Sequence, residues 1–132
     1  ERTYLYVHPY LGQEMKLMRQ AASLLTKKYV FGTYFKDKVA YPRTLRRIKI
    51  NRKGRTLFFT FSSISFVRNL VRRLASLLLM VGGGKIHVDL LEEMLDKGRQ
   101  PGALQDKAMA KLKRVSTKTK QPTEETGTIL RT

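Results

Sequence analysis

The chain has 132 residues, enough for one domain, and 42% of them are apolar, so it can bury a core. Lysine and arginine together number 27 against 10 acidic residues, and the formal net charge of +17 is spread along the chain. A chain this basic repels itself unless polyanions are near, so nucleic acid is the first partner indicated and an anionic membrane surface the second, while the absence of cysteine excludes disulfides and thiolate zinc sites.

The first elements in the chain are a predicted strand and a predicted helix. Tyr4 and Tyr6 lie two residues apart, which is the period of a strand, and Pro9 and Gly12 end that strand. The segment EMKLMRQAASLLTKK then shows a helical period. The apolar positions on one face of this helix are Met15, Met18, Ala22 and Leu25.

The middle of the chain predicts a β-hairpin. The stretch YVFGTYF is short, aromatic and broken by Gly32, and Pro42 bars a regular central strand. In TLRRIKINRKGRTLFFTF, two alternating segments flank a turn at Gly54. The basic residues of this hairpin are Arg46, Arg47, Arg52, Lys53 and Arg55.

The stretch SISFVRNLVRRLASLLLMVGGGK predicts a second helix, from Phe66 to about Val81, with Ser65 as its N-cap. Its first turns are amphipathic, and its last turns are apolar on all sides. The polar side of the first turns carries arginines without any acidic residue, and guanidinium groups suit phosphate and carboxylate. The pattern leaves two interpretations of this helix face open: it binds a ligand, or it is exposed to solvent. These arginines are Arg68, Arg72 and Arg73.

The last part of the chain predicts one more helix and then a weak strand and a tail. The segment VDLLEEMLDKG carries Leu90, Leu91, Met94 and Leu95 on one face, AMAKLKRV is a weak strand, and residues 116–132 read as a flexible tail. The element order predicts an α+β fold for residues 1–115, an antiparallel sheet with helices packed on one face.

Other candidate sites are explained by structural roles. Gly82 to Gly84 before Lys85 could suggest phosphate binding, but such loops follow a strand, whereas this one follows a helix, so a helix stop is favoured. His8 and His87 lack acidic or histidine neighbours at ligand spacing, so we expect no metal site. In the sequence, no Asp or Glu has neighbouring residues that identify it as catalytic.

Taken together, the motifs resemble the tRNA pseudouridine synthase A family. SFVRNLVRRLASLLLMVGGGK is similar to the family's S-F-L-x-x-M-V-R-x-I-V-G-x-L-L-x-V-G-x-G-K, and ERTYLYVH to its R-x-Y-x-Y strand. EMKLMRQAASLL, YPRTLRRIKI and IHVDLLEEMLDKGR resemble family segments in the same order, over about Arg2 to Arg99. The matching residues of the central motif include Ser65, Phe66, Val71, Arg72, Val81, Gly82, Gly84 and Lys85.

The resemblance implies conversion of uridine to pseudouridine in the tRNA anticodon stem-loop, without a cofactor. It also implies a homodimer whose subunits each have two α+β halves with the active cleft between them, and a catalytic Asp in an R-T-D-x-G-V-H-A motif. By resemblance, Tyr4 lies beside the target base, and Arg72 pairs with that Asp, which keeps the carboxylate ionised.

The R-T-D-x-G-V-H-A motif does not occur in this chain. We therefore interpret the chain as a C-terminal half, inactive by itself, that binds tRNA and acts as a homodimer or with a partner half carrying the Asp. The alternative is a catalytically silent RNA-binding module. We expect a cytoplasmic protein, with the mitochondrion as the alternative, and no membrane association. The predicted RNA-binding residues are Arg43, Arg46, Arg47, Arg52, Lys53, Arg55, Arg68, Arg73 and Lys85.

Overall fold

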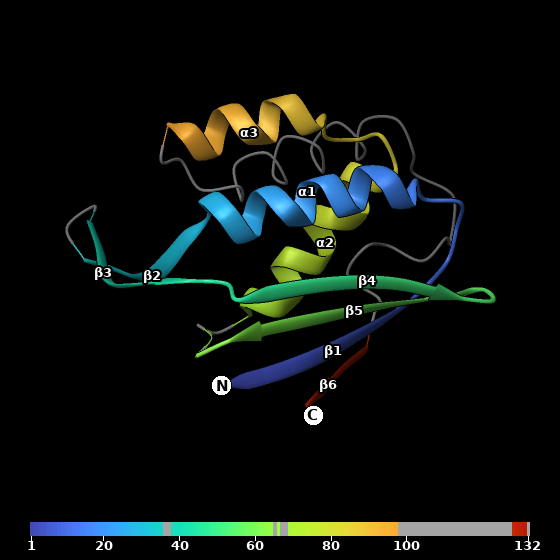
Figure 1. Cartoon of the computed structure of the whole chain (residues 1–132), viewed down its shortest axis with the longest axis horizontal. Helices are drawn as coiled ribbons and strands as arrows, with labels where there is room; N and C mark the ends of the chain where they lie inside the picture. Colours follow the sequence, from blue (N-terminus) through green and yellow to red (C-terminus); the bar gives the residue numbers. More distant parts are fainter. Residues whose placement is uncertain (36–37, 65, 67–68, 98–127, 132) are drawn as a thin grey trace, which may run out of the picture.

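The protein, seen in a computed structural model that describes residues 1–35, 38–64, 66, 69–97 and 128–131, is built on a four-stranded antiparallel sheet (Figure 1). The strand order is β4-β5-β1-β6, and β2 pairs with β3 in a separate two-stranded sheet. The described helices all lie on one side of the larger sheet, which confirms the predicted α+β class. The elements are β1 (Arg2–Pro9), α1 (Met15–Lys28), β2 (Val30–Phe35), β3 (Lys38–Thr44), β4 (Arg47–Lys53), β5 (Thr56–Ser63), α2 (Leu70–Gly82), α3 (Val88–Asp96) and β6 (Thr128–Arg131).

The predicted hairpin is confirmed, and it supplies the centre of the core. Phe59 and Phe61 of β5 are fully buried on the helix side, whereas Phe58, the residue before Phe59, lies on the opposite face and is only half-buried. The register pairs Tyr6 of β1 with Phe59, and their rings meet edge-on with centroids 6.0 Å apart. The turn at Gly54 has a φ of +61°, a conformation that glycine adopts without steric penalty.

The two longer helices approach each other closely at Gly82, the last residue of α2. A Cβ atom at this position would lie 2.6 Å from Cγ of Met18 on α1, so a larger residue cannot fit without a shift. The Glu14 amide, at the start of α1, donates to the Gly82 carbonyl at 2.9 Å. The end of α2 is therefore fixed against the start of α1.

The predicted beginning of α2 is wrong by about one turn. The helix begins at Leu70, because Asn69 before it has a left-handed φ of 63°, and no side-chain hydrogen bond caps the helix. Asn tolerates this conformation better than most residues do. Phe66, which fits the apolar helical stripe in the sequence, instead packs in the preceding loop, while Ser65 and Arg68 lie outside the described residues.

The remainder of α2 follows the prediction, and α3 departs from it at one position. Leu79 and Met80 are each 1% exposed, so the last turns of α2 are buried on all sides. In α3, Leu91 and Met94 are buried, but Leu90 is 44% exposed. The prediction for Leu90 is wrong because the apolar face of a nine-residue helix that contacts one layer is narrow.

Strand β6 lies within the segment that was predicted to be a flexible tail. Residues Thr128 to Arg131 pair antiparallel with β1, with Tyr4 opposite Arg131. The prediction for residues 116–132 is therefore wrong for these four residues, since the open edge of β1 offers backbone partners that a short segment can use. The weak strand predicted from AMAKLKRV lies outside the described residues.

Candidate functional site

The two residues assigned to catalysis by resemblance lie on the same side of the sheet. Tyr4 and Tyr6 project from β1 toward the helices, and the half-buried Arg72 lies in the first turn of α2. The Arg72 guanidinium carbon is 5.9 Å from the centre of the Tyr6 ring, within the range of a cation–π interaction. The Tyr4 ring meets Phe66 edge-on, with centroids 5.0 Å apart and an interplanar angle of 89°.

The start of α2 is electrostatically suited to an anion. The positive end of the helix dipole lies here, and the first turn contains Arg72 and Arg73 but no acidic residue. A cation at this end of a helix is disfavoured by about 0.3–1 kcal/mol, whereas an anion is favoured by a similar amount. A carboxylate or phosphate brought to this position would therefore be stabilised by the dipole and by the arginines together.

A second basic region surrounds the β4–β5 turn. Arg52, Lys53 and Arg55 are all exposed. Arg52 is held in place, since its Nε donates to the Gly54 carbonyl at 2.9 Å and its guanidinium lies 3.7 Å from the centre of the Tyr10 ring. Fixing one arginine in advance lowers the entropy lost when a phosphate binds.

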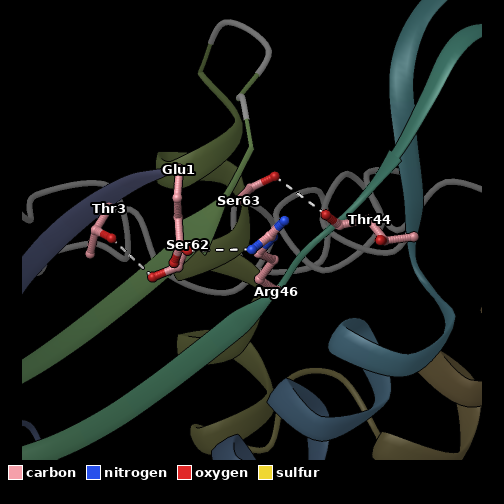
Figure 2. Close-up of polar contacts among 6 residues, drawn as sticks. All are labelled: Glu1, Thr3, Thr44, Arg46, Ser62 and Ser63. Carbon is pink, nitrogen blue, oxygen red and sulfur yellow. Dashed lines mark hydrogen bonds and ion pairs between the residues drawn. The ribbon is translucent and has the colours of Figure 1, made fainter.

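Arg46 and Arg47 lie at the other end of β4, away from the turn. The Arg46 amide donates to the Ser62 carbonyl at 2.8 Å, and its guanidinium forms an exposed ion pair with Glu1 at 3.5 Å (Figure 2). Around them, Thr3 and Ser62 share a hydrogen bond of 3.1 Å, which ties β1 to β5. The basic residues of the predicted hairpin thus form two groups and not one.

The remaining predicted RNA-binding residues are dispersed. Arg43 lies on β3 of the smaller sheet and is half-buried, and Arg73 is exposed beside Arg72 on α2. Lys85 is exposed beyond the C-terminal end of α2. Arg73 is thus next to Arg72 by sequence alone, and Arg43 and Lys85 lie on other parts of the fold.

The glycines after α2 form a helix stop, as the sequence analysis favours. The amides of Gly83, Gly84 and Lys85 donate to carbonyls of Leu79, Val81 and Met80 at 2.9–3.1 Å. Because these amides already have acceptors, they are not available to cradle a phosphate. A cleft of about 490 Å³ lies beside this segment and includes His8 and Glu14 in its lining.

His8 and His87 have structural roles. His8 is 2% exposed, and its Nδ1 donates to the Pro9 carbonyl at 2.8 Å. His87 is the N-cap of α3, where its Nδ1 accepts from the Asp89 amide at 3.2 Å. Within the described ranges, no group of three or more His, Cys, Asp or Glu side chains is placed to hold a metal ion. Among the same residues, no helix has the length and apolar character needed to cross a membrane.

Two features of the site were missed in the sequence. Tyr6 lies under Arg72, and its position two residues after Tyr4 already places both rings on one face of the strand. Arg19 and Lys27 of α1 line a basic groove together with Arg46 and Arg47, although the helical period alone assigns them to a solvated face. Only the contact between α1 and the edge strand β4 brings these four side chains together.

By its fold, the chain is a basic α+β domain with a four-stranded and a two-stranded antiparallel sheet. The sequence pattern that describes tRNA pseudouridine synthases matches residues 29–118, a stretch that includes Arg72 and begins after Tyr4. The chain therefore belongs to the tRNA pseudouridine synthase family.

Individual relatives agree with this assignment. The chain is 33% identical over 107 residues to tRNA pseudouridine synthase A of Pyrobaculum aerophilum, covering 78% of this chain and 41% of that protein. It is 32% identical over 102 residues to tRNA pseudouridine synthase A 1 of a Bacillus cereus strain, covering 73% of this chain and 40% of the relative. It is 35% identical over 75 residues to tRNA pseudouridine synthase A of Bordetella petrii, covering 54% of this chain and 28% of the relative. The chain thus spans about two fifths of the length of the Pyrobaculum aerophilum and Bacillus cereus relatives.

Proposed function

We propose that this chain is the RNA-binding half of a tRNA pseudouridine synthase and contributes Tyr4 and Arg72 to the catalytic cleft. The observation that carries this proposal is the position of Arg72, which is half-buried at the positive end of α2 and lies over an aromatic ring on the strand that also bears Tyr4. Arg72 also lies within the stretch that matches the family. An arginine on a solvated face would need neither the burial nor the ring.

The reaction requires a nucleophilic or basic carboxylate and no oxidant. The bond between C1′ and N1 of uridine breaks, a bond between C1′ and C5 forms, and the proton lost from C5 is balanced by one gained at N1. In our proposal the carboxylate belongs to an Asp of the half that carries R-T-D-x-G-V-H-A. Arg72 forms an ion pair with it and holds it ionised and oriented. Tyr4 packs against the uracil once the base has left its stack.

The remaining basic residues hold the RNA backbone. Arg52, Lys53 and Arg55 are exposed on the β4–β5 turn, where guanidinium and ammonium groups can neutralise phosphates. The net charge of +17 favours association with a polyanion. A second copy of the complete enzyme completes the assembly as a homodimer, and the absence of cysteine suits a reducing compartment such as the cytoplasm.

Two measurements test the proposal. The chain alone should bind unmodified tRNA with a log affinity that falls with log salt by roughly 0.7–0.9 per phosphate contact, and it should form no pseudouridine. The same chain fused behind a family half that carries R-T-D-x-G-V-H-A should form pseudouridine. A fusion that folds and binds tRNA yet stays inactive would contradict the catalytic part, and salt-insensitive binding would contradict the RNA part.

A second candidate is a catalytically silent RNA-binding module, which the absence of R-T-D-x-G-V-H-A from the upstream gene and from any partner chain would support. The two proposals differ in what the fusion does. A silent module binds tRNA in the same way in both forms, and Arg72→Ala then changes affinity alone. The sequence encoded upstream of this chain in the source genome gives an independent test, because the enzyme requires the Asp motif there or in a partner chain.

A further inference from the structure

A groove between α1 and the edge strand β4 carries a second cluster of cations. Its volume is about 320 Å³. We propose that this α1–β4 groove binds phosphates of the RNA backbone and extends the grip beyond the β4–β5 turn. The proposal rests on the proposed function in taking RNA as the ligand. The residues that line the groove are Arg19, Ala22, Ser23, Thr26, Lys27, Arg46, Arg47, Ile48 and Ile50.

The charge of the groove is one-sided. Arg19, Lys27, Arg46 and Arg47 contribute cations, and none of the lining residues is acidic. The nearest described ion pair is that of Arg46 with Glu1, at 3.5 Å between side chains that are 56% and 49% exposed. Such exposed pairs contribute little and are screened by salt, so the groove keeps its positive potential.

Arg19 is oriented by the sheet edge. Its Nε and Nη2 donate to the carbonyl of Ile50 at 3.4 and 3.1 Å, so one edge of the guanidinium is fixed against β4. An arginine has five N–H donors, and the others remain for a ligand. Ile48 and Ile50 give the groove an apolar side, and Arg19, Lys27, Arg46 and Arg47 are themselves exposed and accessible to a ligand.

A structural role for Lys27 at the end of α1 explains that residue but not the other cations of the groove. Lys27 lies in the last turn of α1, where a cation stabilises the negative helix end. Lys28, its neighbour, also lies in the last turn of α1, and it donates a 2.7 Å hydrogen bond to Asp96 of α3. Stabilisation of the helix end does not account for Arg19, Arg46 and Arg47, which line the same groove as Lys27.

The groove is lined by residues of β4 from Arg47 to Ile50, and the β4–β5 turn follows Lys53 at the end of the same strand. A strand rises about 3.3 Å per residue, so Arg47 and Lys53 are roughly 20 Å apart along β4. One nucleic-acid strand of several nucleotides, at about 3.4 Å of rise each, covers that distance. The edge of β4 therefore offers a path along which a single RNA backbone can contact both groups of cations.

Two matched pairs of variants on α1 test the groove. Lys27→Gln removes a groove charge and Lys16→Gln removes an exposed charge of the same helix outside the groove. Ser23→Glu places a carboxylate in the groove, and Gln20→Glu places one on the exposed surface beside it. The affinity of the full chain for unmodified tRNA is measured against salt for all four, after thermal melts have shown that each is folded.

We expect Lys27→Gln to reduce the salt slope by about 0.7–0.9 and Lys16→Gln to leave it unchanged. We also expect Ser23→Glu to weaken binding more than Gln20→Glu. Equal effects within both pairs, with salt-dependent binding by the wild type, overturn the groove and leave the proposed function intact. If the wild type does not bind tRNA even at low salt, the proposed function fails. Titration with inorganic tripolyphosphate, followed by amide resonances of Ser23 and Ile48, then decides the groove: shifts that Ser23→Glu abolishes support an anion site, and unchanged resonances overturn it.

Discussion

The β4–β5 turn and the start of α2 both present arginines, and they differ in burial and in neighbours. Arg52 and Arg55 are exposed on a turn, whereas Arg72 is half-buried over the Tyr6 ring at the positive end of a helix. Exposed charges interact weakly and are screened by salt, while a partly desolvated charge interacts strongly with one well-placed partner. The difference teaches that net charge indicates affinity for a polyanion, and that burial of a single cation indicates a specific anionic partner.

The largest expected effect comes from Arg72→Ala in the fusion that carries the Asp half. Losing a group that orients a buried carboxylate costs about 2–4 kcal/mol, so turnover at saturating tRNA should fall roughly 30- to 1,000-fold while tRNA affinity changes little. Single-turnover kinetics with unmodified tRNA measure both quantities. Since Arg72 contacts Tyr6 of the core, the variant must first melt within a few degrees of wild type. A folded variant that keeps its rate and loses only affinity would make Arg72 a phosphate contact like those of the turn.

The next effect concerns the packing that fixes α2 in place. In Gly82→Ala the new methyl would lie 2.6 Å from Met18 Cγ, so the buried Met18 side chain or the helices must shift, and we expect a loss of about 1–3 kcal/mol in the free energy of unfolding. Gly83→Ala is the matched control, because the nearest atom to its Cβ is the Leu79 carbonyl oxygen at 3.3 Å. Chemical denaturation of both variants measures the difference. Equal stabilities would show that Gly82 is not required for the approach of α1 to α2.

A smaller effect is expected at the turn. The double variant Arg52→Ala with Arg55→Ala should reduce the salt slope of tRNA binding by about one to two units, because up to two phosphate contacts are lost. Turnover of the fusion at saturating tRNA should be unchanged. The control is Lys16→Ala with Lys97→Ala, which removes the same charge from helix surfaces. A loss of saturating turnover in the turn variant would place the turn in the cleft.

Much of the fold follows from local patterns in the sequence. The alternation in β5 and the turn glycine predict the hairpin, and the helical periods predict α1 and most of α2. The start of α2 could not be predicted in this way, since neither the left-handed φ of Asn69 nor the contact of Phe66 with Tyr4 leaves a mark on the helical period. Strand β6 is too short to show a period, and it exists only where β1 offers an edge.

The candidate site was predictable to a lesser degree. The resemblance picked out Tyr4 and Arg72, and the structure adds Tyr6 and Phe66 as their neighbours. The basic hairpin residues divide into two groups because a seven-residue strand separates its ends, and alternation alone does not give that distance. The groove on α1 was not predicted at all, since its cations come from segments about 20 or more residues apart that meet only in the folded chain.

The smallest expected effect concerns Lys28, an exposed cation that serves the fold and no ligand. The hydrogen bond to Asp96, with the charges of Asp96 and Glu92, raises the pKa of Lys28 above its ordinary value of 10.5, although desolvation opposes the shift. Because the pKa is raised in the folded state, the stabilisation is fully present below the unfolded pKa and is lost as the pH rises through the folded one.

An NMR titration of the Lys28 side chain between about pH 8 and 12 should show the raised pKa, and Asp96→Asn should lower it toward 10.5. Melting temperatures of wild type and Asp96→Asn should then differ slightly at neutral pH and converge at high pH. Lys28→Gln should also leave the salt slope of tRNA binding unchanged, in contrast to Lys27→Gln beside it, and a reduced slope for Lys28→Gln would show that a lysine already paired on α3 also contacts RNA.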